Sequence, residues 1–289
     1  MVLCKKCDYA IITRGDNMER YLIAIDLDGT LLRDWATVSD ETIQYLNEIQ
    51  TLGHKIVLAT GRPFRSSEKF YDSLNLDTPL INYNGGLVTS KNDPDFNGYS
   101  LTVNKDAILD IFESNRKYIH NAFGEVRDDI YLLEDTEEIQ PLIHNFNGAK
   151  LIVGEFKETL KEPTNGFIII ANKGEGHLIE KYVKDHYAET VLFRNWGNEY
   201  RFIIELFSPE TNKGRALKYV SNYLGFEQKN VIAFGDAHND IEMLQFAGKS
   251  IAMKNAQECL FEYADEVTEL PNTENGVINH LKKIIKKQF

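Results

Sequence analysis

The chain has 289 residues, and 44 acidic against 32 basic residues give it a formal net charge of −12 with histidine neutral. This length favours about two domains, and the negative charge argues against a dedicated nucleic-acid-binding protein. No apolar run approaches the ~18 residues that a membrane span needs. The three cysteines, Cys4, Cys7 and Cys259, are too few for a disulfide framework, so we expect a cytoplasmic protein.

Residues 1–17 precede the first convincing strand pattern, and we expect them to form a flexible N-terminal extension. Their apolar residues at 10–12 form a shorter stretch than the ~7–15 residues of a signal-peptide core. A second methionine, Met18, stands just before the first strand. Cys4 and Cys7 resemble half of a zinc site, but no second cysteine pair follows, so no zinc is expected there.

From Tyr21 onward, short apolar runs alternate with helical patterns, which predicts parallel β-α-β units whose strands are buried on both faces. Ser39 is the expected N-cap of the first helix, and Gly53 ends that helix. The predicted elements are, in chain order, a strand at 21–26, a helix at 40–52, a strand at 54–60, a helix from about 63 and a strand at 80–83.

The pattern changes over residues 87–207, where apolar and polar residues alternate as in antiparallel strands. We expect strand segments at 122–134, 191–195 and 200–207 and helices at 104–119 and 175–187, which together form an inserted α+β cap domain. The β-α-β rhythm then resumes with a helix at 212–224, a strand at 230–234, a helix at 239–246, a strand at 250–253 and a final lysine-rich helix. The predicted fold is therefore a Rossmann-like, doubly wound parallel sheet formed by 18–86 plus 208–289, interrupted by a cap at 87–207.

Polar side chains follow the predicted core strands where each strand ends. Because ligands of open parallel sheets bind outside the carboxyl ends of the strands, these side chains are the candidate site. They are Asp26 to Asp28 after the first strand, Thr60-Gly61-Arg62 after the second, Asp236 to Asp240 after a later one, and Lys213 at the start of the helix that re-enters the core.

Carboxylates that converge in this way repel one another unless a cation neutralises them, and a site made of oxygen ligands favours Mg²⁺. Thr60, Lys213 and Asn239 offer a hydroxyl, a positive charge and an amide to an anion. We therefore expect a phosphoryl group to lie between the metal and these donors. Two alternatives stay open for Arg62, which can reach the phosphate or pair with an acidic neighbour, whereas His238 is expected to face solvent.

Over about residues 20–289, the set of motifs resembles the haloacid dehalogenase superfamily, in its Cof-type phosphatase branch with a type IIB cap. The matching motifs are Asp26-Leu27-Asp28-Gly29-Thr30, Thr60-Gly61-Arg62, Lys213-Gly214 and Gly235-Asp236 with Asn239-Asp240, and the finer matches are Asn82-Tyr83-Asn84-Gly85 and Ala252-Met253-Lys254-Asn255-Ala256. The resemblance implies a magnesium-dependent phosphatase that hydrolyses small phosphomonoesters, such as sugar phosphates or phosphorylated cofactors.

The resemblance also implies roles for individual residues. Asp26 is the expected nucleophile, which forms an aspartyl-phosphate, and Asp28 is the expected general acid and base. The expected metal ligands are Asp26, the backbone carbonyl of Asp28, and Asp236, with Asp240 orienting them from behind. The expected phosphate-binding residues are Leu27 and Gly61 through their backbone N–H groups, together with Thr60, Arg62, Lys213 and Asn239.

Other functions remain possible on the same motifs. A phosphomutase would transfer the phosphoryl group to a sugar hydroxyl, and a phospho-acceptor regulatory module would use the aspartate as a switch. A halide-cleaving dehalogenase needs neither the second acid nor the metal, so Asp28 and Asp236 argue against it. In the cap, the polar candidates for substrate contact are Arg127, His144, Arg194 and Glu199. The expected partner is a small phosphate ester, with no nucleic acid and no membrane.

Overall fold

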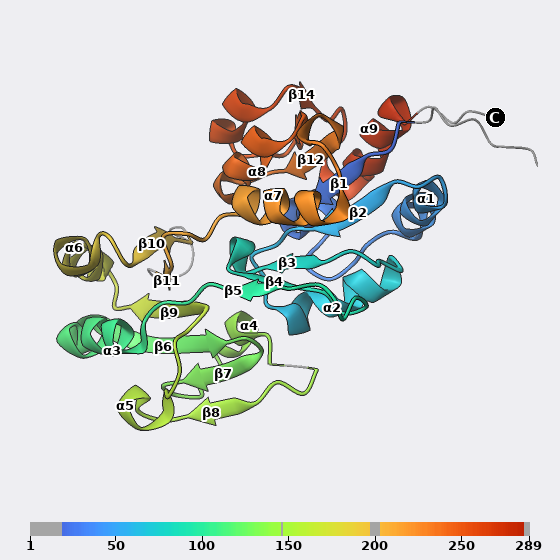
Figure 1. Ribbon diagram of the computed structural model, residues 1–289. Coiled ribbons are helices and arrows are strands. Elements are labelled where there is room, and N and C mark those ends of the chain that lie inside the picture. The colour runs from blue at the N-terminus through green and yellow to red at the C-terminus, as the bar shows by residue number, and fades with distance from the viewer. Residues whose placement is uncertain (1–18, 146, 197–202, 286–289) are drawn as a thin grey trace, which may run out of the picture.

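Two separate main sheets with their helices make up the computed structural model, which describes residues 19–145, 147–196 and 203–285. Figure 1 shows the first and last parts of the chain, in blue and in orange to red, together in one body, and the green and yellow middle part in another. None of the helices within these described ranges is long and apolar enough to cross a membrane.

The core sheet has five parallel strands in the order β14-β13-β12-β1-β2. These strands are β1 (Leu22–Ile25), β2 (Lys55–Leu58), β12 (Val231–Gly235), β13 (Lys249–Ala252) and β14 (Glu266–Val267). β1 lies between β12 and β2, with Leu22 opposite Val231 on one side and Lys55 on the other. All four residues of β1 are buried, as expected for a strand covered on both faces.

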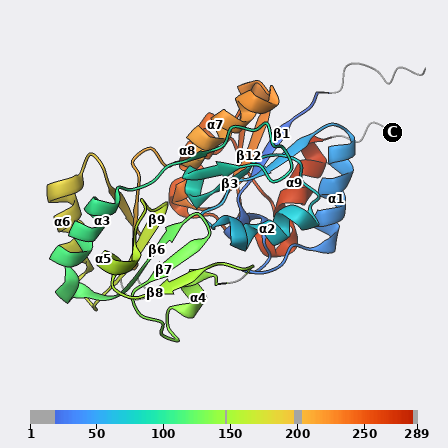
Figure 2. The same cartoon turned by 60° about the horizontal axis from the view of Figure 1, so that its bottom comes forward.

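Helices cover both faces of this sheet, so the predicted doubly wound parallel fold is confirmed. One face packs against α1 (Asp40–Thr51), α2 (Phe64–Ser73) and α9 (Gly276–Ile284), and the other against α7 (Lys213–Leu224) and α8 (Ile241–Phe246). Figure 2 shows α1 and α9 side by side, and Lys282 of α9 bonds Glu41 of α1 at 2.7 Å. Ser39 caps α1 as predicted, because its side chain accepts the Thr42 N–H at 3.2 Å.

A small antiparallel sheet continues the core beyond β2. It consists of β3 (Leu80–Asn82), β4 (Leu87–Thr89) and β5 (Tyr99–Ser100), and a parallel bridge between Ala59 and Ile81 connects it to β2. β4 pairs with β3 and β5 pairs with β4, so both extend a sheet that begins in the core although they follow residue 86. The domain boundaries at residues 87 and 207 stay a prediction.

The cap sheet has six strands in the order β10-β11-β9-β6-β7-β8. The strands are β6 (Ile119–Val126), β7 (Asp129–Leu132), β8 (Leu151–Val153), β9 (Gly166–Ala171), β10 (Leu192–Asn195) and β11 (Ile203–Phe207). Side chains of α3 (Lys105–Ser114), α5 (Phe156–Thr159) and α6 (Gly176–Tyr187) pack on one face, and α4 (Gln140–Ile143) lies in the cluster on the other. The predicted α+β character of the insert is confirmed.

The predicted cap elements differ from the structure mainly at their ends. The helix predicted over 104–119 ends at Ser114, because the Asn115 side chain donates to the Ile111 carbonyl at 2.8 Å and a short 3-10 helix leads into β6. The segment predicted at 122–134 is a hairpin of β6 and β7. Residues 1–18, 200–202 and 286–287, on which parts of other predictions fall, lie outside the described residues.

Candidate active site

A buried lysine joins two carboxylates at the carboxyl end of the core sheet. Asp26 follows β1, and Asp240 follows the loop after β12. The Lys213 ammonium at the start of α7 lies 2.6 Å from Asp26 Oδ1 and 2.6 Å from Asp240 Oδ1. All three side chains are buried, and Lys213 has no exposed surface. The two aspartates thus share one counter-charge in a site from which water is largely excluded.

Asp240 is fully engaged by protein donors. Its Oδ2 accepts the backbone N–H groups of Asp236 at 3.0 Å and Ala237 at 3.1 Å, while its Oδ1 accepts from Lys213. These bonds fix the loop that carries Asp236. Asp240 therefore orients the loop that carries Asp236, and its expected position behind metal ligands stays a prediction.

Asp236 completes the acidic cluster from the opposite side. One carboxylate oxygen from each of Asp26, Asp236 and Asp240 lies within 4.8 Å of the others. Asp236 Oδ1 accepts the hydroxyl of Thr30 at 3.0 Å. Gly29 permits this approach, since its φ is +79° and a Cβ at this position would lie 2.3 Å from Asp236 Oδ2.

The cluster carries an excess of negative charge. Burial raises the pKa of Asp26 well above its ordinary value, Lys213 opposes this effect, and Asp240, Asp236 and Asp28 add to it. Burial and Asp240 likewise raise the pKa of Asp236 to about 7. Burial lowers the pKa of Lys213, but Asp240 and Asp26 outweigh it and the net shift is upward. The site therefore favours an additional cation.

The donor set fits a hard divalent cation. Asp26 uses its Oδ1 for Lys213, and Asp236 uses its Oδ1 for Thr30, so each keeps its second oxygen for a metal ion. Carboxylate oxygens with room for water and substrate oxygens are the ligands that Mg²⁺ prefers.

Asp28 is separated from the cluster by an ion pair with Arg62. Arg62 bonds both carboxylate oxygens of Asp28, with Nε 2.7 Å from Oδ2 and Nη2 on Oδ1. The same Nη2 donates to the Trp35 carbonyl at 2.7 Å, and the guanidinium lies over the Phe70 ring at 5.4 Å. Of the two alternatives left open for Arg62, the structure shows the pairing with an acidic neighbour. A contact with phosphate stays a prediction.

The expected anion donors lie at the same end of the sheet. Thr60 is buried after β2, and its Oγ1 accepts the Arg62 N–H at 3.1 Å, so its hydroxyl proton can be donated elsewhere. Asn239 donates to Asn84 Oδ1 at 2.7 Å. Gly61 is exposed, the Leu27 side chain is buried in the core cluster, and His238 is exposed as expected.

Three residues with structural roles at this site carried no role in the sequence analysis. Thr30 holds Asp236, and Asn84 holds Asn239 from a left-handed backbone with φ 54°. The third is Arg65 of α2, which connects core and cap. Asn84 belonged to a motif that matched the family but had no individual role, and nothing in the sequence near Arg65 indicated its partners.

Arg65 is almost completely buried and bonds several cap groups. Its guanidinium pairs with the buried Glu125 carboxylate of β6 and donates to the carbonyls of Ile143 at 2.7 Å and His144 at 3.0 Å. Its backbone N–H donates to Asp128 Oδ1 at 2.9 Å. These bonds hold the cap against α2, next to the loop that carries Arg62.

The four polar cap candidates have different positions. His144 lies near the site, because Arg62, Arg65 and Asp28 all influence its pKa. Arg194 instead pairs with Glu205 within the cap, with Nε 3.1 Å from Oε2. Arg127 occupies the turn between β6 and β7, and Glu199 lies outside the described residues.

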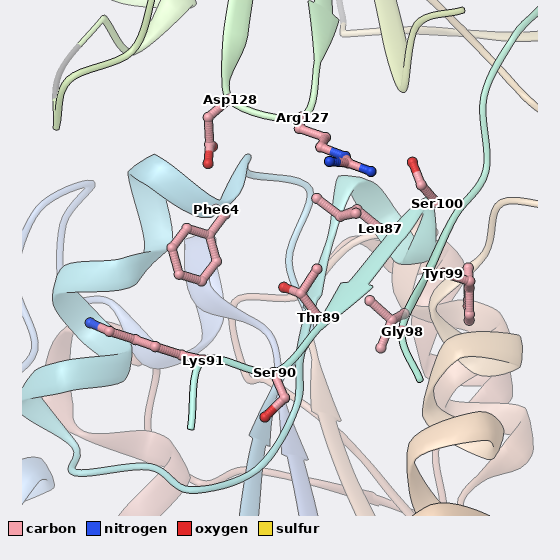
Figure 3. Close-up of a pocket in the computed structure, with 11 residues that line it drawn as sticks. Phe64, Leu87, Thr89, Ser90, Lys91, Gly98, Tyr99, Ser100, Arg127 and Asp128 are labelled. Carbon is pink, nitrogen blue, oxygen red and sulfur yellow. The ribbon is translucent and has the colours of Figure 1, made fainter. Parts of the chain in front are cut away.

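A cleft of about 490 Å³ separates the turn between β6 and β7 from the small sheet of the core. Figure 3 shows Arg127 and Asp128 facing Leu87, Thr89 and Phe64 across it. None of the clustered carboxylates lines the cleft. The chemistry indicated by the acidic cluster is thus located elsewhere, at the ends of β1 and β12.

A family model described as haloacid dehalogenase-like hydrolase matches residues 23–281. The chain belongs to this family. It is 35% identical over 264 residues to the 5-amino-6-(5-phospho-D-ribitylamino)uracil phosphatase YitU of Bacillus subtilis (strain 168), covering 91% of this chain and 97% of that protein. It is 30% identical over 270 residues to YcsE of the same organism, which carries the same activity name, covering 92% and 96%.

A solved structure titled as the HAD subclass IIB sugar phosphatase BT4131 has the same fold, with a TM-score of 0.72 and 22% identity, covering 91% of this chain and 98% of that one. The resemblance to the Cof-type branch with a IIB cap is thereby confirmed. The protein is a hydrolase of phosphate monoesters.

Proposed function

We propose that the protein is a magnesium-dependent phosphatase of small phosphomonoesters and that 5-amino-6-(5-phospho-D-ribitylamino)uracil is one of its substrates. The observation that carries the proposal is the buried arrangement in which Lys213 bonds Asp26 and a carboxylate oxygen of Asp26 lies within 4.8 Å of one of Asp236. The two relatives named for this substrate support the substrate assignment.

Asp26 is the nucleophile of the proposed reaction. Lys213 holds the Asp26 carboxylate in place, one carboxylate oxygen attacks phosphorus, the bond from phosphorus to the leaving oxygen breaks, and an aspartyl-phosphate forms. A bound Mg²⁺, held by Asp26, Asp236 and the Asp28 carbonyl, supplies positive charge that keeps Asp26 ionised and offsets charge on the phosphoryl oxygens. Thr60, Lys213 and Asn239, with the backbone N–H groups of Leu27 and Gly61, stabilise the same oxygens.

Asp28 is the general acid and base of the proposed reaction. Asp28 must first take up a proton from solvent. It then donates this proton to the leaving oxygen, and as a carboxylate it removes a proton from water when the aspartyl-phosphate is hydrolysed. Arg62 occupies both oxygens of Asp28, so one of its two bonds must be released when the substrate oxygen approaches. Arg62 therefore positions Asp28 before the substrate binds.

The test is phosphate release from three esters, namely the ribitylaminouracil phosphate, a hexose 6-phosphate and p-nitrophenyl phosphate, with and without Mg²⁺. We expect Mg²⁺-dependent hydrolysis that Asp26→Asn lowers by about 10³-fold or more, as for the loss of a covalent nucleophile. The matched control is Asp77→Asn, an exposed aspartate paired with Lys55, which should retain full activity. Full activity of Asp26→Asn would refute the nucleophile, and failure to hydrolyse the ribitylaminouracil phosphate would refute the substrate.

A further inference from the structure

Trp35 is the most exposed of the large apolar side chains in the described ranges, with 78% of its surface accessible. A single exposed apolar side chain is ordinary on a protein surface, so the place of Trp35 in the fold decides whether it has a role. Trp35 lies in the loop between the motif that carries Asp28 and helix α1. Its position next to the catalytic motif calls for a functional explanation.

The loop that carries Trp35 is tightly hydrogen-bonded. Asp34 Oδ1 accepts the backbone N–H groups of Ala36 and Thr37, each at 2.7 Å. The Arg33 N–H donates to the Thr37 carbonyl at 3.1 Å, and Lys69 donates to the Ala36 carbonyl at 3.3 Å. The indole is therefore presented by a fixed backbone, which lowers the entropy that a contact would lose.

The same loop is connected directly to the proposed general acid. Arg62 Nη2 donates both to the Trp35 carbonyl and to the Asp28 carboxylate. Two acceptors of one nitrogen lie about 5 Å apart or less, given ordinary hydrogen-bond lengths. Because Asp28 protonates the leaving oxygen, the loop borders the space that the organic part of the substrate occupies.

The cap residue His144 lies beside Arg65, because its backbone carbonyl accepts from Arg65 Nε at 3.0 Å. His144 is close enough to Arg62, Arg65 and Asp28 for their charges to act on it. Burial, followed by Arg62 and Arg65, lowers its pKa to about 4, so the imidazole is neutral at pH 7. An exposed indole beside the site suits a planar, uncharged group better than a bare polyol.

We propose that Trp35 is a specificity-determining residue whose indole packs against a planar unsaturated ring of the leaving group. The preferred substrates are then phosphate esters of a polyol chain that ends in such a ring. This inference rests on the proposed function, because it uses Asp28 to locate the leaving group. It goes beyond that function by assigning the recognition of the ring to one side chain.

Two substrates that differ only in the ring test this role. Flavin mononucleotide and ribitol 5-phosphate share a phosphorylated pentitol, and only the former carries a fused planar ring. We expect Trp35→Ala to lower kcat/KM about tenfold for flavin mononucleotide, as for the loss of an aromatic stacked on a base. For ribitol 5-phosphate the change should stay under about twofold, and Trp35→Phe should retain most of the activity on both esters.

The matched control is Tyr223→Ala. Tyr223 is also an exposed aromatic, but it lies ten residues beyond Lys213 on α7, or about 15 Å along the helix. It should leave both kcat/KM values unchanged. Equal losses on both esters in Trp35→Ala would show that the loop acts only through Arg62 and Asp28. No loss on either ester would show that the indole contacts no substrate. Both results would overturn the inference.

A binding measurement separates this inference from the proposed function. The chain has two tryptophans, so Trp35 is the only one in a Trp196→Phe background. Adding Asp26→Asn prevents turnover, and flavin mononucleotide should quench the remaining indole fluorescence more strongly than ribitol 5-phosphate does. Hydrolysis without selective quenching refutes the role of Trp35. If neither ester is hydrolysed and neither binds, the proposed function fails as well.

Discussion

Replacing Arg65 by methionine should destabilise the protein strongly, although Arg65 touches no catalytic carboxylate in the cluster. Methionine keeps much of the apolar volume but removes the charge that Glu125 faces. Both side chains are buried, with Arg65 2% and Glu125 6% exposed. Breaking a buried ion pair by removing one partner typically costs about 3–5 kcal/mol, because the remaining charge stays buried without a partner.

The structure allows this estimate to be refined. Arg65→Met also leaves the carbonyls of Ile143 and His144 without their side-chain donor, and each unsatisfied buried acceptor costs about 1–3 kcal/mol unless water replaces the donor. We therefore expect the free energy of unfolding to fall by about 5 kcal/mol or more, at or above the upper end of the range for the ion pair alone. The Glu125→Gln variant should lose less of its free energy of unfolding than Arg65→Met does. The double variant, Arg65→Met with Glu125→Gln, should be more stable than Arg65→Met alone, because no uncompensated carboxylate remains.

The loss should depend on pH in a known direction. Burial raises the pKa of Glu125, and Arg65 opposes that shift. Without Arg65 the folded-state pKa rises further above the unfolded value of about 4.3. A group with a raised folded pKa stabilises the fold while it is protonated, and this contribution is lost as the pH rises through the folded pKa. Arg65→Met should therefore be less destabilised at pH 5 than at pH 8.

Urea unfolding followed by circular dichroism measures these differences, with Arg116→Met as the matched control. Arg116 pairs with Glu155 at 3.8 Å, and both side chains are exposed, so its loss should cost under about 1 kcal/mol. A similar small cost for Arg65→Met, or the same cost at both pH values, would refute the conclusion that the Arg65–Glu125 pair holds cap and core together.

Three further outcomes are expected. Arg62→Ala should lower kcat about tenfold or more on every ester. Arg62→Lys should recover only part of the lost activity, because an ammonium cannot bond both Asp28 oxygens. An unchanged kcat of Arg62→Ala on p-nitrophenyl phosphate would contradict the positioning role of Arg62. Gly29→Ala should abolish activity with the circular dichroism spectrum retained, since its Cβ would clash with Asp236, and an active variant would show that the turn adjusts. Chelation by EDTA should abolish hydrolysis. Mg²⁺ at 100 times its Kd should raise the free energy of unfolding by about 2.7 kcal/mol, which a thermal-shift assay measures. The Asp236→Asn variant should lose most of this stabilisation, and full stabilisation in that variant would show that the ion binds elsewhere.

The core of the fold could be predicted because its strands are continuous apolar runs that end in polar residues. β1 and β12 are buried on both faces, and the rule for parallel sheets places Asp26 and Asp236 at one edge. Lys213 could be added because it begins a helix. The proximity of Asp26, Asp240 and Lys213 could be predicted from this topology alone, without knowledge of side-chain conformations.

The connection between core and cap could not be predicted in the same way. Arg65 and Glu125 are 60 positions apart and come from an α-helix and an antiparallel strand, so neither periodicity nor strand order relates them. The left-handed backbone of Asn84 is a similar case, since the sequence indicates a turn but not which side chain the turn presents. Such contacts depend on the orientation of the cap, which local patterns do not encode.

The position of β1 between β12 and β2 in the core sheet has a consequence for synthesis of the protein. β1 contributes Asp26 within the first part of the chain, yet its neighbour β12 ends at Gly235, and Asp240 follows. On the ribosome, the first segment therefore emerges long before the strand that completes its pairing. A translation product interrupted before residue 236 lacks two of the three carboxylates of the acidic cluster. Under the proposed mechanism, incomplete chains therefore remain inactive as phosphatases until nearly the whole polypeptide has been made.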